Sequence, residues 1–242
     1  MGKLELVQKA WDKFLCKNEE TIGNMQKHAA LVHTSVSQNY DKLPYSFHTN
    51  MVSNTFMQFA AECFINIAEY ENAIESDGLA AIFGSIFHDT IEDCRLTYND
   101  VVKIAKEYMG QAQAELAADI VYALTNEKGK TRAERANEKY YRGIRETPYA
   151  PCIKLCDRYA NAMYANARRT SMAAKYSQEM PEFIEHIKPE DENDTRSQYF
   201  LPADLYRVCM SYPLYKGDNQ VRNPWGWCET IKERRHDNEN DN

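Results

Sequence analysis

The sequence predicts an all-α fold, and three observations support that class. Apolar residues recur at three- and four-residue spacings through most of the chain, which is the period of an amphipathic helix. Strand-like alternation of apolar and polar residues never extends beyond a few positions. The chain contains neither an internal repeat nor a heptad array, so a solenoid and a coiled coil are excluded. We therefore expect a bundle of helices.

Spacing and proline define the elements of the first part of the chain. Amphipathic helices are expected over residues 4–15 and from residue 21 to about residue 32. Pro44 ends a loop over residues 39–44, because the residue before a proline is disfavoured in a helix. A long helix is then expected from residue 47 towards residue 70.

The next boundaries follow from capping residues. Asp77 is expected to cap the apolar helix that leads to the stretch discussed below. Thr97 is expected to cap the following helix, with Asp100 at the acidic position of a capping box. Gly110 separates that helix from another over residues 112–124.

The second half is expected to begin with helices over residues 131–145, 152–169 and 172–187, the first halted by Pro148. Residues 1–187 would then form the main domain. The remainder, 188–242, is expected to begin with an acidic loop over 188–198 and one more helix over 199–212. An aromatic patch over 223–227 is expected to dock onto the main domain, and the polar end from residue 232 is expected to be disordered.

Composition and charge narrow the functional classes. The 242 residues are 43% hydrophobic and 27% charged, which is ordinary for a globular domain. The formal net charge is −7, whereas a nucleic-acid-binding surface needs a basic stripe. We therefore expect no nucleic-acid partner. A small anionic ligand stays compatible with this charge, because a metal and a few cations can bind it inside an acidic protein.

Cysteines and apolar runs bear on the compartment. The seven cysteines are odd in number and irregularly spaced, without a Cys-x-x-Cys pair, so free thiols in a reducing cytosol are expected. The first five residues lack the apolar core of a signal peptide. No run approaches membrane-spanning length. The expectation is a soluble, cytoplasmic protein without a membrane partner, and the sequence does not predict its oligomeric state.

The stretch over residues 83–93 concentrates the chemistry of the chain. An apolar run ends there in His88, Asp89, Glu92 and Asp93. If the stretch is helical, His88 and Glu92 share a face, as do Asp89 and Asp93. Burial raises the pKa of crowded carboxylates unless a cation compensates. A divalent metal resolves the conflict, and the alternative is an exposed, acid-rich helix end.

His48 and Asp157 extend this set. His48 follows a proline-ended loop at an expected helix start, where a capping or packed histidine is the alternative. Asp157 lies on an apolar helix, where an ion pair with Lys154 or Arg158 is the alternative. Two histidines and two aspartates suit Mn²⁺ or Fe²⁺, with Zn²⁺ also possible. Such a set leaves positions for water and a phosphate oxygen.

Three motifs in this order resemble the HD-domain metal-dependent phosphohydrolases. More narrowly, they are similar to the hydrolase domain of RelA/SpoT homologues and of stand-alone guanosine-polyphosphate 3′-pyrophosphohydrolases. The resemblance covers roughly residues 25–185. The motifs are Pro44-Tyr45-x-x-His48, His88-Asp89-Thr90-Ile91-Glu92-Asp93 and Lys154-Leu155-x-Asp157-x-x-x-Asn161.

The resemblance implies an HD-domain helical bundle with a short C-terminal extension. It also implies that one Mn²⁺-like ion is held by His48, His88, Asp89 and Asp157. Glu92 and Asp93 would occupy the catalytic acidic positions, where they orient and deprotonate the attacking water. Asn161 would contact the nucleotide. The implied substrate is an alarmone of the guanosine tetraphosphate type.

Two departures keep other functions open. In the family, basic residues in the loop before Pro-Tyr-x-x-His hold the guanine nucleotide, but residues 34–41 contain none and Lys42 is the nearby cation. The second departure is that no synthetase-like or regulatory half is expected to follow, so any activity is expected to be hydrolytic only. One alternative is therefore an HD-domain nucleotide or deoxynucleotide phosphohydrolase. Another is a non-catalytic module that binds nucleotide, against which the intact Glu92 and Asp93 argue.

Further substrate contacts are weaker predictions. Tyr40 is a candidate for stacking on a base, and an ordinary exposed loop tyrosine is the alternative. Lys139 and Arg142 belong to a cationic segment interleaved with glutamates, which usually marks a solvated face. In the functional interpretation, they reach the phosphates of a ligand. Lys154, close to Asp157, is the better candidate for such a contact.

Overall fold

The computed structural model describes residues 2–126, 129–190 and 195–211, and it confirms the all-α class. The first half contains α1 (Lys3–Lys17), α2 (Glu19–Ser35), α3 (Ser46–Phe59), α4 (Tyr70–Phe87), α5 (Thr90–Cys94), α6 (Tyr98–Ala105) and α7 (Gln111–Leu124). The second half contains α8 (Arg132–Arg135), α9 (Glu138–Glu146), α10 (Ala150–Ala167), α11 (Met172–Ile187) and α12 (Ala203–Ser211). Two 3₁₀ turns, η1 (Ala60–Phe64) and η2 (Ser197–Tyr199), complete the helical part.

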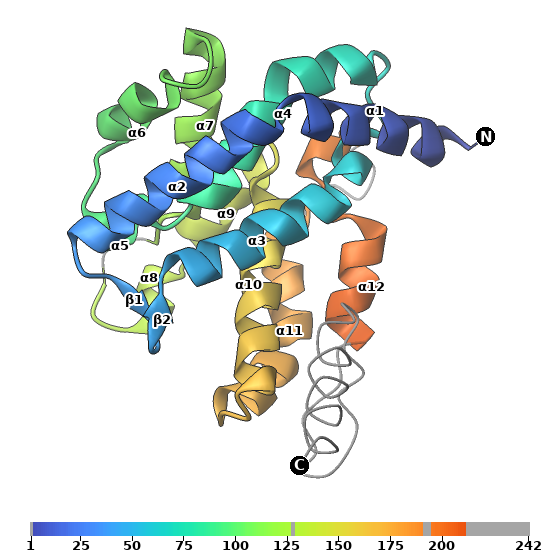
Figure 1. The fold of residues 1–242 in the computed structure, drawn as a ribbon. Coiled ribbons are helices and arrows are strands. Elements are labelled where there is room, and N and C mark those ends of the chain that lie inside the picture. Colours follow the sequence, from blue (N-terminus) through green and yellow to red (C-terminus); the bar gives the residue numbers. More distant parts are fainter. Residues whose placement is uncertain (1, 127–128, 191–194, 212–242) are drawn as a thin grey trace, which may run out of the picture.

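The central helix of the bundle is α4, which packs against α1, α2, α3 and α7 (Figure 1). Every residue from Ala80 to His88 is buried, as expected for a helix that is apolar all round. Gly84 permits the close approach of α7, because a Cβ atom at this position would lie 2.5 Å from Cγ2 of Ile120. The apolar run of the sequence is therefore the core of the domain.

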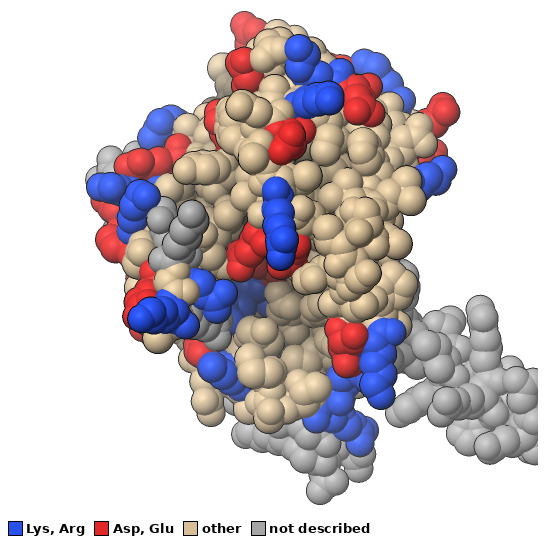
Figure 2. Space-filling model, turned by 90° about the vertical axis from the view of Figure 1, so that its left-hand side faces the viewer, with Lys and Arg blue, Asp and Glu red and all other residues tan. Residues whose placement is uncertain are grey.

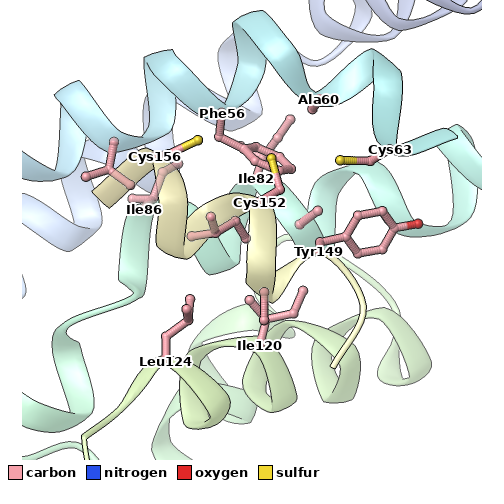
Figure 3. Packing of buried hydrophobic residues seen from close by; sticks show 14 of the residues in the cluster. Phe56, Ala60, Cys63, Ile82, Ile86, Ile120, Leu124, Tyr149, Cys152 and Cys156 are labelled. Atoms are coloured by element: carbon pink, nitrogen blue, oxygen red, sulfur yellow. The ribbon is translucent and has the colours of Figure 1, made fainter. Parts of the chain in front are cut away.

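The interior is closed by α10, which packs against α3 and α11. Its buried face brings Cys152 and Cys156 against Phe56 and Ile82 in one continuous apolar cluster (Figure 3). The described cysteines are all free. No helix in the described ranges is both long enough and apolar enough to cross a bilayer.

The only strands among the described residues form a two-residue antiparallel hairpin in the expected loop. It consists of β1 (Asn39–Tyr40) and β2 (Leu43–Pro44), and Tyr40 pairs with Leu43. Asp41, in the turn, has φ 56°, which an aspartate tolerates better than most residues. The hairpin delivers the chain to the start of α3.

Several local predictions are confirmed. Thr97 and Asp100 form the reciprocal capping box at the start of α6. Gly110 precedes α7, and α11 has the expected bounds. The helix expected over 199–212 is present as α12, which buries Leu205 and Cys209.

Three predictions about helix boundaries are wrong, each because of a tertiary or capping contact. The helix expected from residue 47 towards residue 70 ends at Phe59 as α3. Just beyond its end, the Ser197 hydroxyl donates to the Cys63 carbonyl and accepts a bond from the Asn66 amide. Asp77 caps nothing, since α4 begins at Tyr70; its carboxylate instead accepts a 2.8 Å bond from Tyr149.

The helix expected over 131–145 is split into α8 and α9. Asn137 caps α9, because its side chain accepts a 3.1 Å bond from the Tyr140 amide. The aromatic patch over 223–227 and the polar end lie outside the described residues. Of the loop expected over 188–198, residues 191–194 also lie outside them, and its last two residues belong to η2.

Candidate metal centre

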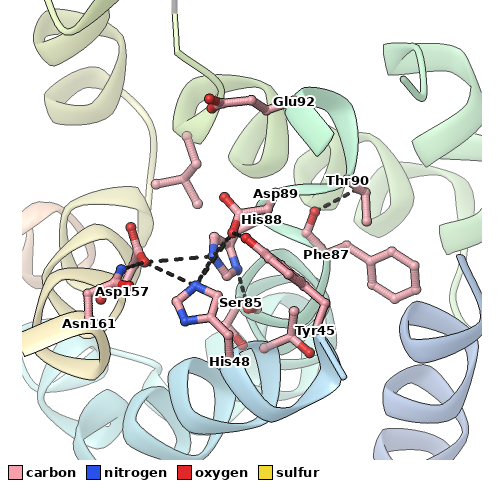
Figure 4. A network of polar contacts seen from close by, with 12 residues as sticks. Tyr45, His48, Ser85, Phe87, His88, Asp89, Thr90, Glu92, Asp157 and Asn161 are labelled. Atoms are coloured by element: carbon pink, nitrogen blue, oxygen red, sulfur yellow. Dashed lines mark hydrogen bonds and ion pairs between the residues drawn. The ribbon is translucent and has the colours of Figure 1, made fainter. Parts of the chain in front are cut away.

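Four side chains predicted as ligands come together from three parts of the bundle (Figure 4). His48 lies in the first turn of α3, Asp89 precedes α5, and Asp157 lies in the middle of α10. His88 is the C-cap residue that directly follows the last residue of α4. The side chains of the two histidines are 2% and 1% exposed. Folding therefore brings motifs that are far apart in sequence into one buried cluster.

The ligand atoms face one another at short distances. Nε2 of His88 lies 3.3 Å from Nε2 of His48 and 2.8 Å from Oδ2 of Asp89. The corresponding distance from His48 to Asp89 is 3.4 Å. Ligand atoms of these three residues all lie within 4.8 Å of one another. Oδ1 of Asp157 completes the cluster at 3.3 Å from His48 and 3.9 Å from His88.

This donor set requires a positive charge at its centre. Nδ1 of His88 lies 2.9 Å from the Ser85 carbonyl, which can only accept, so Nδ1 carries the proton of that bond. In the neutral imidazole, Nε2 then presents a lone pair to His48 and to the Asp89 carboxylate. Electron-rich atoms at these distances repel one another unless a proton or a metal cation lies among them. Imidazole and carboxylate ligands also suit a divalent transition metal, so the residues fit the ion that the motifs predict.

In the metal-free cluster, a proton on His48 supplies that charge. Burial lowers the pKa of His48, but hydrogen bonds and charges from Asp157 and Asp89 outweigh burial and raise that pKa to about 9. The carboxylates respond in the opposite direction. Although burial raises the pKa of Asp89, its contacts with the two neighbouring histidines hold that pKa well below its usual value.

Asp157 is held by two neighbours on its own helix. Lys154 donates from Nζ to Oδ2 at 3.0 Å, and Asn161 donates from Nδ2 to Oδ1 at 2.7 Å. Burial raises the pKa of Asp157, but Lys154 and then His48 lower it well below its usual value. Lys154 and Asn161 were predicted as substrate contacts. In this structure, both lie beside the predicted metal ligands, and both bond to Asp157.

Tyr45 is a part of the site to which sequence reasoning gave no role. Its hydroxyl donates to Oδ2 of Asp89 at 2.6 Å, and its ring stacks on His33 with centroids 4.3 Å apart. Burial and the charge of Asp89 raise the pKa of Tyr45 far above its usual value, so the hydroxyl remains a donor. The available signal was its place three residues before His48, which brings it to the same helix start.

Glu92 and Asp93, the two acidic residues that follow His88 and Asp89 in the sequence, differ in burial. Asp93 is half-buried, and burial, followed by the charge of Asp89, raises its pKa. Glu92 is exposed and stands apart from the four ligands (Figure 4). Its carboxylate accepts a 2.7 Å bond from Nδ2 of Asn126 and lies 3.9 Å from Arg135. Helix α4 ends before His88 and α5 begins after Asp89, so the stretch over residues 83–93 is not one continuous helix.

The remaining predicted contacts differ in position. Tyr40 lies directly on the site, because its ring stacks on His48 at 4.7 Å. Lys139 and Arg142 are exposed on α9, whose buried residues are Tyr140 and Ile144. Their contact with a ligand stays a prediction.

The face that carries α5, the β1–β2 hairpin and α8 is hollowed (Figure 2). Asp and Glu side chains gather above the hollow, and Lys and Arg side chains surround its lower edge. This arrangement can accept a ligand that carries both a cation and phosphate groups, since each finds an opposite charge nearby.

Comparisons with family models, with curated proteins and with solved structures found no match for this chain.

Proposed function

We propose that this protein is a metal-dependent phosphohydrolase of the HD type that acts on a phosphorylated nucleotide. One observation carries the proposal: the electron-rich atoms of His48, His88, Asp89 and Asp157 converge at 2.8–3.9 Å in a buried cluster. Such a cluster is expensive to bury without a cation.

We propose Mn²⁺ as the ion, with Fe²⁺ and Zn²⁺ as alternatives, because two imidazoles and two carboxylates suit this group of metals. When bound, the ion would lower the pKa of a water molecule and offset the charge of a phosphate. The protein's own residues orient the ligands: Ser85 fixes the ring of His88, and Tyr45 fixes the carboxylate of Asp89.

Asp93 and Glu92 are proposed as the acidic residues of the reaction. Burial, followed by the charge of Asp89, raises the pKa of Asp93, which makes its carboxylate a better proton acceptor. This residue is one helical turn from Asp89, with a 2.8 Å backbone bond between them. Glu92 is held by Asn126 at the outer side of the ligands. There, it could receive and direct the water that approaches from the hollow.

For the substrate, we propose a guanosine polyphosphate of the alarmone type, cleaved at its 3′-pyrophosphate. Lys154, beside Asp157, is the cation best placed for a phosphate. A second candidate is another nucleotide or deoxynucleotide, because the loop before α3 lacks the basic residues that hold guanine in the resembled family. The free thiols of the described cysteines support a reducing, cytoplasmic location.

The test combines metal content with product identification. Wild-type protein and Asp89→Ala are loaded with Mn²⁺, desalted, assayed for bound metal and screened against nucleotides with a 3′-pyrophosphate or only a 5′-triphosphate. Asp119→Asn is the matched control, since Asp119 is an exposed aspartate bonded to Tyr98 at another part of the surface.

We expect wild type and the control to bind one metal and to release pyrophosphate from the 3′ position, while Asp89→Ala loses both properties. Hydrolysis of the 5′-triphosphate alone would favour the second substrate class. Bound metal and bound nucleotide without any hydrolysis would indicate the non-catalytic module. Wild-type protein that binds no metal would refute the metal centre.

A further inference from the structure

The two histidines of the cluster are supported differently. Nδ1 of His88 has a carbonyl partner, Ser85, at 2.9 Å. Nδ1 of His48 is buried and lacks a hydrogen-bond partner among the described residues. Metal-binding histidines almost always donate their second nitrogen to a partner, which fixes the plane of the ring. Something other than a hydrogen bond must therefore orient His48.

The ring of Tyr40 lies where such a support is needed. It stacks on His48 with centroids 4.7 Å apart and planes 19° apart. The same ring also contacts Tyr164 of α10, with centroids 4.6 Å apart and planes 57° apart. Tyr164 in turn donates from its hydroxyl to Asp41, the residue that follows Tyr40, at 3.0 Å. The Tyr40 ring thus contacts both His48 and a residue of α10.

The hydroxyl of Tyr40 reaches a second ligand of the cluster. It donates to Oδ1 of Asn161 at 2.8 Å, and Nδ2 of Asn161 donates to Oδ1 of Asp157 at 2.7 Å. That same oxygen of Asp157 lies 3.3 Å from Nε2 of His48. The contacts form a closed ring from His48 through Tyr40, Asn161 and Asp157 back to His48.

We propose that Tyr40 is a positioning residue of the metal centre, whose ring orients His48 and whose hydroxyl orients Asp157 through Asn161. This inference depends on the metal centre proposed above. It assigns Tyr40 a role different from stacking on the base of a substrate. It also gives the β1–β2 hairpin a function, because the hairpin holds Tyr40 against the start of α3.

Co²⁺ titration tests the proposal, because its visible absorption reports the arrangement of the ligands as well as the affinity. Removal of a group that orients a metal ligand typically weakens metal affinity by about 10- to 100-fold. We expect a loss of that size, with an altered spectrum, for Tyr40→Leu. Tyr40→Phe keeps the stack and loses only the hydroxyl, so its loss of affinity should be measurable but smaller than that of Tyr40→Leu, with band positions close to those of the wild type.

Two tyrosines far from the centre provide matched controls. Tyr98→Phe removes a hydroxyl that donates to Asp119 at 2.8 Å, and Tyr122→Leu removes an aromatic ring that is 63% exposed. Both should keep the wild-type affinity and spectrum. Thermal unfolding of each metal-free variant, followed by circular dichroism, separates a folded variant from an unfolded one.

A second measurement covers the case in which Tyr40→Leu does not fold. Tyr40→Phe and Asn161→Ala interrupt the same chain of hydrogen bonds, so their effects on Co²⁺ affinity should be non-additive in a double-mutant cycle. Unchanged affinity and spectrum in Tyr40→Leu would overturn the inference while leaving the metal centre intact, as would additive effects in the cycle. Wild-type protein that binds no Co²⁺ would refute the metal centre itself.

Discussion

Cation binding at this cluster should displace a proton from His48, and the size of the effect follows from the structure. The Asp157 and Asp89 carboxylates hold the pKa of His48 at about 9 despite its burial. At pH 7, about one His48 in 100 is then neutral, and only a neutral imidazole binds a metal. Apparent Mn²⁺ affinity should therefore rise about tenfold per pH unit below that pKa. Between about pH 6.5 and about pH 8.5 the rise is about 100-fold, or ~2.7 kcal/mol.

Isothermal titration calorimetry under anaerobic conditions measures this coupling. The dependence of the binding heat on the ionisation enthalpy of the buffer should give close to one proton released per Mn²⁺ near neutral pH. His186→Gln is the control, because His186 is a 43% exposed histidine on α11; it should show the wild-type slope. Affinity that stays constant across this pH range, without proton release, would refute the assignment of the proton to His48.

The pKa of His48 also determines whether the stability of the metal-free protein rises or falls with pH. The folded-state pKa of His48, about 9, exceeds its unfolded value of about 6.5. The stabilisation of the folded state by protonated His48 is therefore fully present below about pH 6.5 and is lost as the pH rises through about 9. The depressed pKa values of Asp89 and Asp157 act at acid pH, outside this window. Urea unfolding of chelated protein should show a falling midpoint over that range.

Three substitutions test other parts of the structure. Glu92→Gln should retain Mn²⁺ and lose at least about 100-fold in turnover, the scale of general acid–base catalysis; undiminished hydrolysis would dismiss its role. Tyr45→Phe keeps the ring but removes the 2.6 Å bond to Asp89, so Mn²⁺ affinity should fall by about 10- to 100-fold in direct titration, and a wild-type value would contradict the support role. Gly84→Ala places a Cβ atom 2.5 Å from Ile120 and should lower the free energy of unfolding by about 1–3 kcal/mol in urea; a neutral effect would mean that α4 and α7 separate easily.

Local signals in the sequence predicted those parts of the fold that depend on neighbouring residues. Thr97 and Asp100 form their capping box within one turn. The end of α3 at Phe59 and the partner of Asp77 depend on Ser197 and Tyr149, which are distant in sequence. Periodicity carries no information about such contacts, so these boundaries could not be predicted.

The candidate site likewise contains residues that the sequence predicted and residues that only the folded structure brings near. His48, His88, Asp89 and Asp157 stand in motifs whose order predicted their meeting, and the structure brings them together. The groups that orient them belong to the surrounding fold. Tyr40, for example, belongs to the β1–β2 hairpin and contacts His48 of α3 and Tyr164 of α10, and no spacing rule connects those segments.

The ligands come from α3, the α4–α5 junction and α10, and this origin makes a bound ion a cross-link between distant segments. A ligand that binds only the native state stabilises it by about 2.7 kcal/mol at a concentration 100 times its Kd. If the proposed ion binds, its supply would then also influence how long the folded chain survives proteolysis in the cell. Starvation for the ion would lower the abundance of the folded protein.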